Sequence, residues 1–123
     1  EIRQEQKERV ILIAAADRQE EAEESLDELE ELAKTAGAET VARVIQIRED
    51  ASSGNLYWKG VKIDEVSALL YGTDATGVIC DDELSPAQIG NLERMLDTKV
   101  MDRTLLILDI LPEEPIQRKE IYR

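Results

Sequence analysis

The stretch RVILIAAA at residues 9–16 is a continuous apolar run that ends at Asp17. A run without polar alternation is typical of a strand buried on both faces, as in parallel sheets covered by helices. After Asp17 the pattern changes to helical spacing, with inward positions at Ala22, Leu26, Leu29, Ala33 and Ala36. Asp17 and Glu20 are spaced as a capping box, and Gly37 is placed to end the helix. This strand followed by a helix predicts an α/β domain.

The later apolar segments continue to alternate between strand and helix patterns. In chain order they predict a strand at Thr40–Ile47, a helix at Val61–Tyr71 ended by Gly72, a strand at Thr76–Cys80, a helix at Ser85–Leu96, a strand at Lys99–Met101 and a segment Arg103–Leu111 that fits either a helix or a strand. We therefore expect a small parallel four-stranded sheet of βαβ units with helices on both faces, in the order 2-1-3-4.

The size of the chain, 123 residues, is that of one domain. We expect this α/β domain to span residues 9–111, after a disordered or frayed start at residues 1–8. Pro112 and Pro115 favour an irregular C-terminal tail at residues 112–123, because proline cannot continue a helix.

The charge and composition bound the function. A net charge of −13, from 28 acidic and 15 basic residues, disfavours nonspecific binding to DNA or to a membrane surface. The single cysteine and the lack of a long apolar run predict a cytoplasmic protein. The absence of histidine removes the commonest general base and the commonest zinc ligand.

Four acidic residues follow the first and third predicted strands. They are Asp17, Asp81, Asp82 and Glu83. In a 2-1-3-4 sheet these positions lie at the switch point, where parallel sheets place their ligands. One interpretation is a Mg²⁺ or phosphoacceptor site. Another is purely structural, because the capping box at residues 85–88 begins a helix whose dipole favours nearby carboxylates.

A second candidate surface lies in the connection between the second strand and the second helix. It comprises Tyr57, Trp58, Lys59, Gly60 and Lys62. Lys59 and Lys62 are the first candidates for an RNA contact, and the two aromatic side chains either cover an edge of the core or stack on bases. Cys80 ends a buried strand without a histidine partner, so we interpret it as a core residue.

The segment DDELSPAQIGNLE at residues 81–93 resembles the N-terminal domain of HflX-type GTPases. Other pieces agree in order, including RVIL at residues 9–12, KV at 99–100, DRT at 102–104 and LILDI at 106–110. The resemblance implies a noncatalytic α/β binding domain ahead of a separate GTPase domain in a cytoplasmic, ribosome-associated protein. It also implies the large ribosomal subunit as partner.

The sequence departs from the family at several places. It contains no G-x-x-x-x-G-K-[ST] phosphate loop, so we expect no enzyme activity in this chain, and GTP and Mg²⁺ only through a separate GTPase domain. Lys59 and Val61 stand where the family has the glycines of a Tyr-x-Gly-x-Gly-Lys segment. These departures leave two alternatives open. One is a stand-alone protein-interaction or self-association module, and the other is a Mg²⁺-dependent or phosphoaccepting protein with an acidic pocket.

Overall fold

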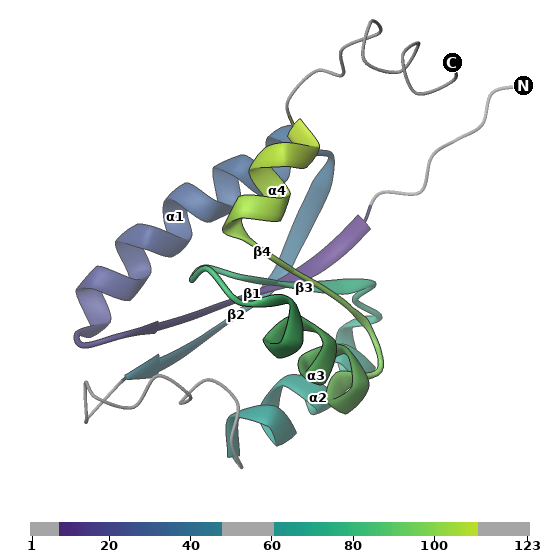
Figure 1. Cartoon of the computed structure of the whole chain (residues 1–123). Coiled ribbons are helices and arrows are strands. Elements are labelled where there is room, and N and C mark those ends of the chain that lie inside the picture. Colours follow the sequence, from purple (N-terminus) through teal and green to yellow (C-terminus); the bar gives the residue numbers. More distant parts are fainter. Residues whose placement is uncertain (1–7, 48–60, 111–123) are drawn as a thin grey trace, which may run out of the picture.

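The computed structural model describes residues 8–47 and 61–110, which form a single α/β unit (Figure 1). Its elements in chain order are β1 (Glu8–Ala16), α1 (Gln19–Thr35), β2 (Ala38–Ile47), α2 (Val61–Thr73), β3 (Gly77–Cys80), α3 (Pro86–Leu96), β4 (Lys99–Asp102) and α4 (Arg103–Ile110). The four strands are parallel and lie in the order β2-β1-β3-β4. The predicted fold class and strand order are confirmed.

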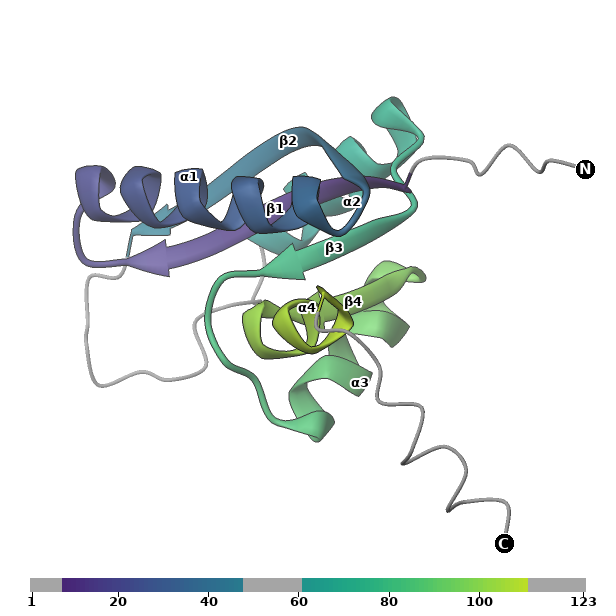
Figure 2. The same cartoon turned by 90° about the horizontal axis from the view of Figure 1, so that it is seen from above.

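Two helical layers enclose the sheet. Helices α1 and α4 cover one face, and α2 and α3 cover the other (Figures 1 and 2). Alternate residues of β1 enter different cores: Leu12 packs with Leu26 and Leu106, whereas Ile13 packs with Val66 and Leu92. This two-sided burial explains why residues 9–16 are apolar without alternation. Each fully buried aliphatic side chain contributes about 1.5–3 kcal/mol relative to an exposed one.

Strand β2 lies at an edge of the sheet, as the expected order 2-1-3-4 implied. Only Val44 is fully buried in it, because β2 has a neighbouring strand on one side alone. The strand begins at Ala38, two residues earlier than expected. Glu8, which the sequence placed in the frayed start, belongs to β1. The other residues of the expected frayed start and of the irregular tail lie outside the described part of the chain.

The helix ends agree with the sequence at some positions and differ at others. The N-cap of α1 is Arg18, with an extended backbone and no side-chain cap, so the predicted capping role of Asp17 is wrong. The helix begins at Gln19, so the position before its first residue belongs to Arg18 and not to Asp17. Gly37 does follow the end of α1, with a φ of 90° that favours glycine.

Helix α2 runs through Gly72 to Thr73, so the predicted stop at Gly72 is wrong. The left-handed backbone needed after the helix falls instead on Asp74, whose φ is 58°. The capping box of α3 is confirmed: Ser85 Oγ accepts from the Gln88 amide at 3.1 Å, and Gln88 Oε1 accepts from the Ser85 amide at 2.8 Å.

The last described segment is a helix, α4, which resolves the open choice between helix and strand. Leu106 turns into the core, while Leu105, Ile107 and Leu108 are exposed at 42%, 39% and 58%. A helix with apolar residues on all sides is normally covered by other protein. The described chain covers only the Leu106 side.

Gly90 is expected to tolerate substitution by alanine. A glycine inside a helix first suggests a close backbone contact that leaves no room for a Cβ, but such a contact is absent at this position. A Cβ at Gly90 would meet only the Arg94 guanidinium, at 3.9 Å. Gly90→Ala should therefore raise the free energy of unfolding by up to about 1 kcal/mol, because alanine has the higher helix propensity. Urea denaturation followed by circular dichroism measures the change.

Gly77→Ala is the matched control for this prediction. A Cβ at Gly77 would lie 3.3 Å from the Lys99 carbonyl oxygen, between two strands. We expect this substitution to destabilise the protein. Equal effects of the two alanines would contradict the proposed difference in local space.

Candidate functional site

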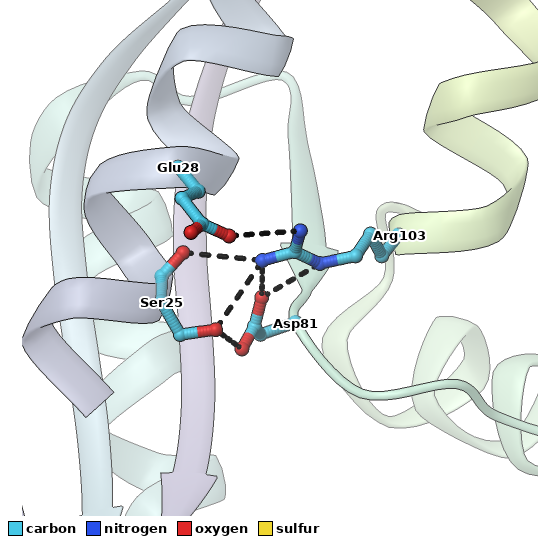
Figure 3. Close-up of polar contacts among 4 residues, drawn as sticks. All are labelled: Ser25, Glu28, Asp81 and Arg103. Carbon is cyan, nitrogen blue, oxygen red and sulfur yellow. Dashed lines mark hydrogen bonds and ion pairs between the residues drawn. The ribbon is translucent and has the colours of Figure 1, made fainter. Parts of the chain in front are cut away.

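Asp81 is the centre of a polar network at the carboxyl ends of the strands (Figure 3). It directly follows β3, and its amide donates to the Ile13 carbonyl of β1 at 2.8 Å. Its Oδ1 accepts from Arg103 Nη2 at 2.6 Å and Nε at 3.1 Å, and its Oδ2 accepts from Ser25 Oγ at 2.6 Å. Both carboxylate oxygens are thus engaged, and the side chain is only 9% exposed.

Arg103 extends this network to α1. Its Nη2 also donates to the Ser25 carbonyl at 3.2 Å, and its Nη1 lies 3.6 Å from Glu28 Oε1. Ser25, Glu28, Asp81 and Arg103, which we call the Arg103 network, therefore join α1, the end of β3 and the first turn of α4 (Figure 3). Two nitrogens of the guanidinium donate to one carboxylate oxygen, Oδ1 of Asp81, and such charge-assisted hydrogen bonds are stronger than those between neutral groups.

The Arg103 network bears on whether the four predicted acidic residues could form a Mg²⁺ or phosphoacceptor site. Arg103 engages Oδ1 of Asp81 and Ser25 engages Oδ2, so a Mg²⁺ ion or a phosphoryl group at Asp81 would compete with these two side chains. In residues 8–47 and 61–110, no three His, Cys, Asp or Glu side chains lie close enough together to hold a metal ion. Asp17 and Asp82 have interactions of their own, and Glu83 is exposed.

Asp102 is a second polar centre, which the sequence analysis missed. The residue is 3% exposed, and it is the only polar or charged residue among those described that is buried as a whole. Oδ1 accepts from the Leu105 amide at 2.9 Å, which caps α4, and Oδ2 accepts from the Leu84 amide at 2.9 Å, which fixes the loop before α3. An aspartate just before an apolar helical segment was the available signal.

The second candidate surface is largely untested. Tyr57, Trp58, Lys59 and Gly60 lie outside the described residues. Lys62 belongs to the first turn of α2. Their roles in an RNA contact or in aromatic packing stay predictions.

The acidic outer face of α1 is partly neutralised by one arginine from β2. Arg43 Nη2 donates to Asp27 Oδ1 and to Glu30 Oε1, each at 2.7 Å. The hydrogen bond to Glu30, followed by that to Asp27, raises the pKa of Arg43 above its usual value. This pairing attaches α1 to the edge strand at a solvent-exposed position.

Cys80 is expected to be chemically inert in the folded protein. Burial, together with the charges of Asp82, Asp102 and Asp81, raises the pKa of its thiol above the usual range. Since the thiolate is the reactive form, Ellman's reagent at pH 8 should modify the native chain far more slowly than the chain in guanidinium. Equal rates in the two conditions would contradict the buried-core interpretation. This prediction follows the sequence-based assignment of Cys80 to the core, where the structure places it.

These observations define the class of the protein as a small α/β domain with a parallel sheet, in which an ion pair joins the end of β3 to α4 at the switch point. No helix in residues 8–47 or 61–110 is long and apolar enough to cross a membrane. Residues 23–111 match the family described as GTP-binding GTPase N-terminal, and the chain belongs to this family.

The relatives are proteins named GTPase HflX. The chain is 57% identical over 113 residues to the one from Lacrimispora saccharolytica, covering 91% of this chain and 26% of that protein. It is 35% identical over 106 residues to the one from Escherichia coli, covering 86% and 25%. The chain thus spans about a quarter of the length of these relatives. The suspected resemblance to the N-terminal domain of HflX-type GTPases is confirmed.

Solved structures support the same fold. A crystal structure of a mutation variant of SsGBP superposes with a TM-score of 0.64 at 16% identity, over 91% of this chain and 36% of that chain. Identity at this level supports the fold alone.

Proposed function

We propose that the chain serves as a noncatalytic N-terminal binding domain of a cytoplasmic, HflX-type GTP-binding protein, and that it contributes to association with the large ribosomal subunit. The observation that carries the proposal is 57% identity over 113 residues to a GTPase of which the matching part is only 26%. In this proposal GTP and Mg²⁺ bind a separate domain, and this chain supplies a surface.

The geometry at the switch point supports a noncatalytic role. Asp81, whose side chain is 9% exposed, engages Arg103 and Ser25 through its two carboxylate oxygens. A metal ion or a phosphoryl group at Asp81 would compete with Arg103 and Ser25 for these oxygens. The purified chain is accordingly expected to release no phosphate from GTP above the buffer background.

A stand-alone interaction or self-association module is the second candidate. The exposed Leu105, Ile107 and Leu108 of α4 favour it, because apolar side chains on one short helix are typical of a covered surface. Light scattering at several concentrations tests self-association directly.

Co-sedimentation with purified ribosomal subunits tests the leading proposal. We expect the chain to pellet with large subunits at moderate salt, and to pellet with small subunits no more than an acidic control protein of equal size and charge does. Equal recovery with both subunits would contradict it.

The predicted RNA contact gives this experiment a matched pair of variants. Lys59→Glu should reduce recovery, since removal of a cation from a phosphate contact weakens binding. Lys34→Glu makes the same charge change at an exposed position in the last turn of α1 and should have a smaller effect. Equal losses of recovery in the two variants would show that binding depends on the total charge of the chain and not on the position of Lys59.

A further inference from the structure

A largely apolar pocket opens between the first turns of α3 and α4. Its volume is about 440 Å³, within the range of small-ligand and side-chain binding sites. The apolar part of the lining is formed by Leu84, Pro86, Ile89 and Leu105. Asp102 also lines the pocket, and its two oxygens accept hydrogen bonds from the amides of Leu84 and Leu105, one on each side of the pocket.

The pocket continues into an exposed apolar strip on α4. Leu105 lines the pocket and is 42% exposed, and Leu108, one turn further along the same helix, is 58% exposed. Residues three apart on a helix are neighbours on its surface. An extended or helical segment that places one apolar side chain in the pocket can therefore place a second over Leu108.

The charged side chains that line the pocket are all acidic. Glu83, Glu93 and Asp102 line it, and no lysine or arginine is among the described residues that do so. Arg103, which follows Asp102, directs its guanidinium to Asp81 and α1 (Figure 3). Arg94 of α3 donates to Asn91 on its own helix, and its guanidinium lies near Gly90 at the edge of the pocket without lining it. The pocket therefore combines an apolar lining with an acidic rim.

This combination selects among possible occupants. A second copy of this chain would bring a net charge of −13 to an acidic rim, and a nucleic acid would bring further negative charge. A basic segment with apolar side chains is complementary in both respects. We propose that the pocket binds a lysine- or arginine-rich segment of another protein, which inserts one apolar side chain between α3 and α4 and places cations at Glu83 and Glu93.

The inference goes beyond the proposed function, since it concerns a protein partner and stands whether or not ribosomes are bound. Three labelled synthetic peptides test it by fluorescence anisotropy with the intact chain. The first has two leucines three residues apart, flanked by lysines. The second replaces the leucines by alanines, and the third replaces the lysines by glutamates. We expect the first to bind at least about tenfold more tightly than either of the others.

Variants locate the binding. Leu105→Ser and Leu108→Ser should each lower the affinity for the first peptide several-fold. Glu83→Lys should also lower this affinity, and the loss should become larger as the salt concentration is lowered. Met95→Ser is the apolar control, because Met95 is 49% exposed and does not line the pocket. Glu20→Lys on the first turn of α1 is the charge control. Thermal melting verifies that each variant is folded.

Several outcomes would overturn the proposal. Equal affinity for the leucine and alanine peptides would show that the peptide binds through its charge alone and that no apolar side chain enters the pocket. Equal losses in Leu105→Ser and Met95→Ser would place the binding elsewhere. Failure to co-sediment with ribosomal subunits leaves this titration unaffected, so the two proposals fail separately.

Discussion

Arg103→Ala is expected to lower the free energy of unfolding by about 2–4 kcal/mol, because it leaves the carboxylate of Asp81 without its cation. The Asp81 side chain is 9% exposed and that of Arg103 is 27% exposed, so water replaces the lost contact poorly. The substitution also removes the hydrogen bond to the Ser25 carbonyl, which connects α4 to α1. Urea denaturation measures the loss, and the urea dependence of the unfolding free energy shows whether the unfolded state has changed as well.

Arg43→Ala is the matched control for Arg103→Ala, because both arginines contact two acidic side chains and both bind α1. The partners of Arg43, Asp27 and Glu30, are 70% and 42% exposed, against 9% for Asp81. An exposed pair of this kind contributes at most about 1 kcal/mol. If Arg43→Ala costs as much as Arg103→Ala, burial of Asp81 is not the cause of the larger effect.

A double-mutant cycle separates the pair from its surroundings. Asp81→Asn removes the charge of Asp81 while keeping a polar side chain beside Ser25. The combined variant Arg103→Ala with Asp81→Asn should lose less stability than the sum of the two single variants, because the buried charge is gone. Simple additivity would show that the two side chains act independently.

The sheet order was predictable because local patterns carry it. Two examples are the apolar run at residues 9–16 and the capping box of α3. The run indicates burial of a whole strand, and the capping box depends on residues that are close in sequence. Because βαβ connections between parallel strands are right-handed, only a few arrangements of four strands are then possible. The helical nature of α4 was not predictable from its apolar residues, since an eight-residue apolar segment fits either period.

The Arg103 network was not predictable for a different reason. Arg103 lies 22 residues from Asp81 and 78 residues from Ser25 in the sequence, so no local pattern joins them. The sequence placed Asp81 correctly at the switch point but could not show which cation meets it. The same carboxylate that suggested a Mg²⁺ site is held by an arginine of the protein itself.

Asp102→Ala is expected to lower the free energy of unfolding by about 2–4 kcal/mol. The loss of an N-cap costs about 0.5–2 kcal/mol, and a buried amide left without a partner costs about 1–3 kcal/mol more. Asp102 satisfies two amides at once, those of Leu84 and Leu105, from a position that is 3% exposed. Urea denaturation measures the change, and hydrogen exchange at these two amides locates it.

Ser85→Ala is the control for capping alone, because Ser85 caps α3 from an exposed position and holds only the Gln88 amide. It should cost about 1 kcal/mol. Asp102→Asn should fall between the two, since the amide side chain keeps one oxygen for a cap and presents an NH₂ group to the other backbone donor. If Asp102→Ala costs no more than Ser85→Ala, the contact to Leu84 contributes nothing. In that case the wall of the α3–α4 pocket is ordered by packing and not by this carboxylate.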